Sequence, residues 1–430
     1  MNKKVYILLI ILYKLSLEVL YAGNLCKIYN YLGVILDYNA YKMSISWIIF
    51  FLLIIVILGF EKDKFWFTVM QILFIFVIIP SLSLYGLKNI PTIHFMYNIV
   101  FWLIFVIYGK FFSNIRFTKK TKDTIGKSNV NINLIFGLFA ISMITVLIAS
   151  YLYGDFRVMI DFNDIYKYRL ELREINMPVY FRYMLPFIGT IFLPICMMEF
   201  LERKKYVFLG LTLLIGLMLF SINGMKTWLL VYALVFVIYK ITSKKYNSYS
   251  ITNWILMGFI ILSIVGYIIS MYFNNNIISG SIHRMTILVQ EISYYFIDFF
   301  YDKDPLLLRG SILRHILSYP YSMSVEFQIG GLYMGNFASR ANNGLLGDAY
   351  ANFKILGILI YPFMYSLIFK ILQSILRNYN YKTNYFITFI LIWNSMNSSF
   401  FTWLLTGGVI VVCLIYHFNY IMLRKNENNI

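Results

Sequence analysis

The chain contains little charge, few cysteines and few histidines for its 430 residues. Charged residues make up 13% of it, about half of the roughly 25% usual in soluble proteins, while 60% is hydrophobic. A soluble core has no room for that much apolar side chain, so the composition excludes a soluble protein. The three cysteines, Cys26, Cys196 and Cys413, indicate no disulfide framework and match no metal site.

The sequence also lacks the motifs of cofactor enzymes. It has no nucleotide-binding loop, no metal-ligand spacing and no serine triad, so we expect no cofactor and no metal.

Acidic residues are scarce, with 19 Asp and Glu against 37 Lys and Arg. A net charge of +18 would suggest nucleic acid in a soluble protein. Here we expect no nucleic acid, because cytoplasmic loops of membrane proteins collect Lys and Arg.

Long apolar runs recur from one end of the chain to the other. A bilayer core needs about 20 apolar residues per helix, and by this criterion the sequence contains about 12 spans. It therefore predicts an all-α, polytopic integral membrane protein with one transmembrane domain over 1–430. The spans lie near 5–22, 44–60, 65–86, 94–110, 131–153, 183–201, 206–222, 227–243, 251–273, 351–372, 384–398 and 400–421.

The short loops predict the orientation. With 12 spans, the clusters of Lys and Arg all fall on one side, which we predict to be cytoplasmic, together with both termini. The other side carries two enlarged external loops, 154–182 and 274–350. These are too long to be simple connections, and they are rich in charge although they face outward, so we expect function there.

The loop 154–182 is predicted to contain a short helix. Tyr166, Arg169 and Arg173 share one face of it, clear of its acids, and guanidinium groups suit phosphate oxygens. The open alternative is an interfacial helix whose arginines pair with lipid headgroups or with its own acids.

The loop 274–350 is predicted to begin with an amphipathic helix from Ser281 to Tyr301. Arg284, Glu291 and Asp298 recur every seven residues on its polar face, and we expect it to lie in the outer interface. The loop also contains candidate proton acceptors, although lone histidines are often incidental and Asp348 could merely cap the next span. These candidates are His283, His315 and Asp348.

Four stretches resemble the Wzy-type oligosaccharide repeat-unit polymerases of bacterial O-antigen and capsule synthesis. The plan of many spans with two enlarged outer loops, the larger one late, is also similar over the whole chain. The stretches run from Tyr166 to Glu174, from Tyr180 to Tyr183, from Asn223 to Thr227 and from Asn342 to Tyr350.

The resemblance implies a glycosyltransferase in the bacterial plasma membrane. Its substrates would be undecaprenyl-pyrophosphate-linked oligosaccharide repeat units, and its partners membrane lipid, a chain-length regulator and a flippase. A sugar hydroxyl of one unit would attack the anomeric carbon of another, and undecaprenyl pyrophosphate would leave. For this reaction we expect His315, then Asp348, then His283 as general base. Cations expected to bind pyrophosphate are Arg169, Arg173 and Lys226, followed by Arg157, Arg284 and Arg340; Lys226 could instead snorkel to the interface.

Two alternatives remain open from the sequence. A flippase or other transporter of the lipid-linked units would carry charge inside its spans, and these spans are nearly free of it. An O-antigen ligase would share the architecture and the donor and would differ in the acceptor.

Overall fold

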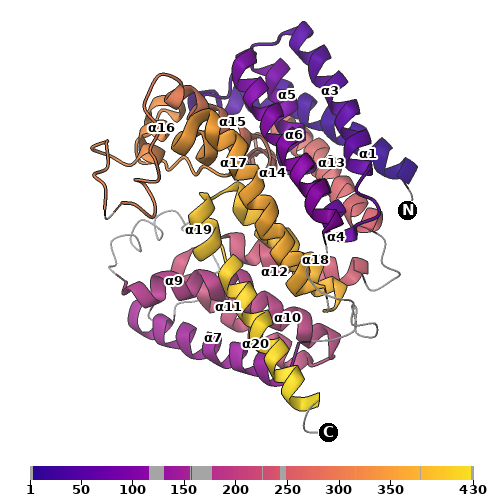
Figure 1. The fold of residues 1–430 in the computed structure, drawn as a ribbon, viewed down its shortest axis with the longest axis vertical. Helices are drawn as coiled ribbons and strands as arrows, with labels where there is room; N and C mark the ends of the chain where they lie inside the picture. Colours follow the sequence, from indigo (N-terminus) through magenta and orange to yellow (C-terminus); the bar gives the residue numbers. More distant parts are fainter. Residues whose placement is uncertain are drawn as a thin grey trace. The chain divides into compact units, whose positions relative to one another are not determined.

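Every secondary-structure element is a helix in the part of the chain that the computed structural model describes (Figure 1). This part comprises residues 3–115, 130–154, 156, 177–224, 226–242, 248–314, 316–377 and 379–427. Nine of its helices are long and apolar enough to cross a membrane. The all-α, polytopic character predicted from the sequence is therefore confirmed.

The predicted spans coincide with helices throughout. Nine of the twelve match the long apolar helices, and the remaining three fall on shorter ones, Tyr206–Asn223, Lys226–Thr242 and Tyr381–Met396. Those three helices contain 18, 17 and 16 residues, and a count of twelve spans stays a prediction.

The helices gather into two compact units. The first contains α1 (Lys3–Leu20), η1 (Tyr21–Leu25), α2 (Cys26–Ile28), η2 (Asn30–Leu32), α3 (Ala40–Leu58), α4 (Lys64–Leu73), η3 (Phe74–Ile78), α5 (Ile79–Leu87), α6 (Thr92–Asn114), α13 (Ser248–Phe273), α14 (Ile277–Met285), α15 (Ile287–Tyr301), α16 (Val325–Met334) and most of α17 (Leu345–Leu376). The second contains α7 (Ile132–Tyr153), α9 (Val179–Phe187), η4 (Ile188–Phe192), α10 (Leu193–Glu202), α11 (Tyr206–Asn223), α12 (Lys226–Thr242) and α20 (Val409–Glu427). Both units receive parts of α18 (Tyr381–Met396) and α19 (Phe400–Leu405).

The first unit is built around the helical run α4–η3–α5, whose apolar window is wholly buried. Its middle, η3, is a π-helix, which leaves backbone carbonyls without their usual α-helical donors. One of these, the Ile75 oxygen, accepts a hydrogen bond from the Tyr13 hydroxyl of α1 at 3.1 Å. The Tyr13 side chain thus provides a hydrogen-bond donor for a backbone carbonyl of the π-helix inside the apolar core.

Loops predicted on the same side of the membrane meet at the same end of this unit. At one end, Lys3 lies 3.6 Å from Glu61, and the Lys110 ammonium donates to the Gly59 oxygen. At the opposite end, Lys88 follows α5 and donates to the Gly33 oxygen. This grouping agrees with the predicted alternation of the spans, and which end is cytoplasmic stays a prediction.

The segment from Ser281 to Tyr301 differs from the single amphipathic helix that we predicted. The backbone breaks at Thr286, with φ −127° and ψ −69°, which divides the segment into α14 and α15. Twelve of the fifteen residues of α15 are buried, including Glu291. Apolar residues occur all round this helix, and such a helix packs inside a protein rather than lying on a surface.

Candidate functional site

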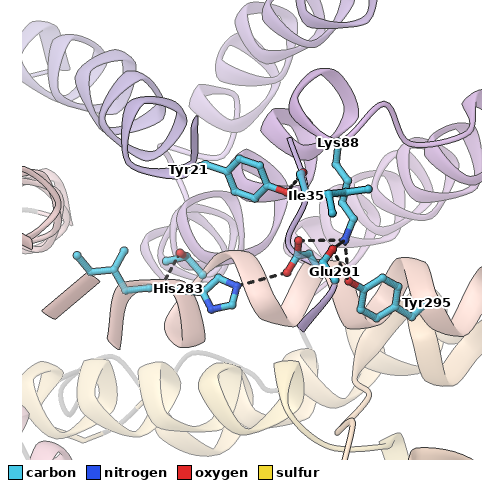
Figure 2. A network of polar contacts seen from close by, with 9 residues as sticks. Tyr21, Ile35, Lys88, His283, Glu291 and Tyr295 are labelled. Carbon is cyan, nitrogen blue, oxygen red and sulfur yellow. Dashed lines mark hydrogen bonds and ion pairs between the residues drawn. The ribbon is translucent and has the colours of Figure 1, made fainter. Parts of the chain in front are cut away.

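The predicted outer end of the first unit contains a buried group of polar side chains from four segments. Tyr29 follows α2, Lys88 follows α5, His283 lies on α14, and Glu291 and Tyr295 lie on α15. Glu291 is 0% exposed, and hydrogen bonds and ion pairs connect it to its neighbours (Figure 2). We call these five residues the Glu291 cluster.

Lys88 is the cation of the cluster. Its Nζ lies 3.2 Å from Glu291 Oε1 and donates to the Tyr295 hydroxyl and to the Gly33 oxygen, each at 2.6 Å. A buried carboxylate is costly unless it is paired and hydrogen-bonded. Lys88 therefore provides the charge that allows Glu291 to be buried.

His283 is the second partner of the carboxylate. Its Nε2 lies 3.3 Å from Glu291 Oε2, and the imidazole is 1% exposed. An ionised carboxylate only accepts hydrogen bonds, so the pairing places a proton on Nε2 and leaves the Nδ1 of a neutral ring as an acceptor. Figure 2 shows the second ring nitrogen pointing away from Glu291. This is the arrangement of a carboxylate-oriented general base.

Tyr29 covers one face of the imidazole. The two rings stack with centroids 5.0 Å apart and planes 14° apart. Burial raises the pKa of the Tyr29 hydroxyl, and the charge of Arg284, the residue after His283, opposes this rise. Arg284 is exposed, so a guanidinium faces solvent next in sequence to the buried imidazole.

The segment around α16 packs on the other side of the cluster. The ring of Tyr333 stacks on Tyr295 at 4.8 Å, and the Tyr333 hydroxyl donates to Asp298 at 2.7 Å. Gly33, with φ +78°, has no room for a side chain, because a Cβ would lie 2.5 Å from the Tyr333 carbonyl oxygen. Burial raises the pKa of Tyr295, and the Glu291 carboxylate adds to this rise, so its hydroxyl remains protonated at neutral pH.

The structure brings two of the predicted site residues together, His283 and Arg284. Arg340 lies in the segment after α16, where it is exposed and 3.9 Å from Glu326. Lys226 begins α12, and only its backbone belongs to the described part. The remaining predicted residues lie outside the described residues: Arg157, Arg169, Arg173 and His315.

Asp348 is buried in the first unit, and its carboxylate is occupied. Oδ2 accepts from the Phe400 backbone N–H at 2.7 Å, and Oδ1 accepts from the Asn352 amide at 2.9 Å. These bonds connect α17 to the start of α19. Asp348 therefore makes structural contacts, and its role as a base stays a prediction.

Sequence reasoning missed Lys88, Tyr29 and the role of Glu291. Lys88 stands in the short loop between the predicted spans 65–86 and 94–110, and the spacing of Glu291 from Arg284 suggested an exposed face. The apolar residues on every side of α15 were the signal that could have shown its burial.

Within the described ranges, no group of three or more His, Cys, Asp and Glu could hold a metal ion. Comparisons of the chain with known protein families, with curated proteins and with solved structures found no match.

Proposed function

We propose that this protein polymerises undecaprenyl-pyrophosphate-linked oligosaccharide repeat units into O-antigen or capsular polysaccharide at the outer face of the bacterial plasma membrane. The single observation that carries this proposal is the Glu291–His283 pair. It supplies an oriented base at the end of the first unit where loops predicted to be external meet. The resemblance of four sequence stretches to the Wzy-type polymerases supports the same reaction.

The proposed step moves one proton and exchanges one glycosidic bond. His283 Nδ1 takes the proton of the acceptor hydroxyl as its oxygen bonds to the anomeric carbon of the donor. The bond from that carbon to the pyrophosphate breaks, and undecaprenyl pyrophosphate leaves with the electron pair. Glu291 stabilises the imidazolium that forms, as a buried carboxylate does when it is hydrogen-bonded to a catalytic histidine. Because the imidazole is buried under the Tyr29 ring, the proposal requires that ring to move before substrate reaches Nδ1.

Arg284 is our candidate for stabilising the leaving group. It follows His283 in the chain and is exposed. A guanidinium suits the oxygens of a pyrophosphate because it can donate two parallel hydrogen bonds to them. Arg169, Arg173 and Lys226 remain candidates for the same pyrophosphate, with Arg157 and Arg340 ranked after them.

The test is complementation of a strain that lacks the gene. The proposal predicts surface glycan of a single repeat unit in the deletion strain and full-length polymer after wild-type complementation. His283→Gln keeps a donor for Glu291 but no base, so we expect about 10²–10⁴-fold less polymer formation at normal protein level. His417→Ala, which changes an exposed histidine of α20, is the matched control. Full-length polymer in the deletion strain would end the proposal.

One observation favours a transporter as the second candidate. Lys14 and Glu18 form an ion pair within α1, and Lys14 is 0% exposed. The Lys14 ammonium also contacts Ser46 of α3 and Ser83 of α5, at 3.1 and 3.2 Å. Charge inside a span often marks a transport pathway. In the same deletion strain, units stranded on the cytoplasmic side would identify a flippase. An O-antigen ligase would instead leave polymer that is not transferred to its final acceptor.

A further inference from the structure

A junction at the predicted outer end of the first unit joins the loop after α15 to the start of α17. Leu306 N donates to the Ala351 oxygen at 2.9 Å, and Leu307 N donates to the Asn352 oxygen at 3.2 Å. Leu308 N donates to the Asn352 side chain at 2.9 Å. These bonds fix the two segments against each other and bring Arg309 and Lys354 to the same junction.

The backbone of this junction is strained at three residues. Leu307 and Leu308 have φ of 50° and 63°, and Lys354 has φ 50° and ψ −129° within α17. Branched and long side chains rarely adopt positive φ, so each of these residues is strained. Strain of this kind persists where the surroundings impose it, and it often occurs at ligand sites.

Within the described part of the chain, the Arg309 guanidinium has a buried donor without an acceptor. This donor is Nε, which donates to no acceptor there, and the residue is only partly exposed. Lys354 has one long hydrogen bond, 3.4 Å from Nζ to the Tyr301 oxygen. A partly buried guanidinium with an unpaired Nε, on a segment hydrogen-bonded to the start of α17 close in sequence to Lys354, has the chemistry of a phosphate site.

We propose that Arg309 and Lys354 bind the pyrophosphate of the acceptor lipid. This inference rests on the proposed function for the identity of the ligand. Lys354 contacts Tyr301, which lies ten residues beyond Glu291 on α15, a rise of about 15 Å. The donor pyrophosphate must touch the carbon that reacts beside His283. The acceptor pyrophosphate lies at the end of its oligosaccharide that is far from the attacking hydroxyl. A distance of about 15 Å from the Glu291 cluster therefore suits the acceptor pyrophosphate and not the donor pyrophosphate.

The first experiment measures binding of farnesyl pyrophosphate and of inorganic pyrophosphate to the purified full-length protein by calorimetry. Arg309→Gln should raise both dissociation constants about tenfold or more, which is roughly 1.4 kcal/mol. Lys354→Gly should also weaken binding while keeping or raising the thermal midpoint, because glycine adopts positive φ freely. Arg314→Gln, an exposed arginine of the same loop, is the matched control and should change neither constant by more than about twofold. Wild-type binding by both Arg309→Gln and Lys354→Gly would overturn the site.

A second experiment separates acceptor from donor and from bulk lipid. A soluble acceptor oligosaccharide without pyrophosphate should be extended equally by wild type and Arg309→Gln, whereas the lipid-linked acceptor should be extended poorly by the variant. If Arg309→Gln extends both acceptors poorly, the site binds the donor, and its assignment to the acceptor pyrophosphate is refuted. Competition by phosphatidylglycerol as strong as that by farnesyl pyrophosphate would show a general headgroup contact and would also refute it. If wild type polymerises nothing but the binding results hold, the proposed function fails and the pyrophosphate site stands.

Discussion

Removing the charge of Lys88 should destabilise the protein more than any change of an exposed lysine. The Lys88→Met variant loses the donor to Tyr295, the donor to the Gly33 oxygen and the cation of a carboxylate that is 0% exposed. Breaking a buried pair by removing one partner costs about 3–5 kcal/mol, because the other charge is left uncompensated. The Glu291 carboxylate would then keep contacts to the His283 imidazole and the Tyr21 hydroxyl but no cation among them.

The second variant, Glu291→Gln, should cost less. Lys88 keeps its contacts to Tyr295 and Gly33, so we expect a loss of about 1.5–3 kcal/mol, typical of a hydrogen bond to a charged group. The double variant should be less destabilised than the sum of the two single changes. Coupling of about 0.5–3 kcal/mol is usual for residues in direct contact.

The assay is reversible unfolding of the purified protein by sodium dodecyl sulfate in mixed micelles, followed by intrinsic fluorescence. Lys110→Met is the control, since the ammonium of Lys110 is exposed and contacts one backbone oxygen. Surface charges of this kind contribute about 0–1 kcal/mol. If Lys88→Met costs no more than the control, or if the two cluster variants add within about 0.5 kcal/mol, the buried pair does not exist as described.

Three further predictions follow from other parts of the chain. Lys14→Met should destabilise the first unit by about 3–5 kcal/mol in the same assay, because Glu18 then loses the cation of its pair within a span, and adding Glu18→Gln should recover part of the loss. Gly344→Ala should lower the yield of folded protein measured by gel filtration, since its methyl group would overlap a backbone carbonyl at the end of α18. In a cysteine-free background, a membrane-impermeant maleimide applied to intact cells should label Tyr31→Cys and spare Lys62→Cys, and the reverse pattern would overturn the predicted orientation.

Apolar runs predicted the helices well, because about 20 consecutive apolar residues suit a bilayer core whatever the tertiary contacts are. The burial of Glu291 could not be predicted by the same reasoning. A seven-residue spacing gives the face on which Glu291 lies, but not whether Lys88, far earlier in the chain, packs against that face. The break at Thr286 also turns α14 relative to α15, and it is tertiary packing that brings His283 to the carboxylate.

The sequence also could not distinguish between the candidate bases, because their surroundings depend on tertiary packing. Asp348 and His283 looked alike in the sequence, as single titratable groups in one outer loop. In the structure, the oxygens of Asp348 accept from Asn352 and Phe400, whereas His283 receives an orienting carboxylate. The Phe400 bond joins residues 52 apart, and the His283–Glu291 contact joins residues eight apart across the break at Thr286. Neither contact follows from residue spacing in a single sequence.

The central claim is tested most directly by reconstituting the reaction. Purified wild-type protein is incubated with lipid-linked repeat units, and the products are followed by mass spectrometry together with released undecaprenyl pyrophosphate. We predict a ladder of whole repeat units, one undecaprenyl pyrophosphate released per bond formed, and loss of the ladder in His283→Gln at equal protein. A ladder formed by His283→Gln at the wild-type rate, or no ladder with wild-type protein that binds the units, would contradict the account.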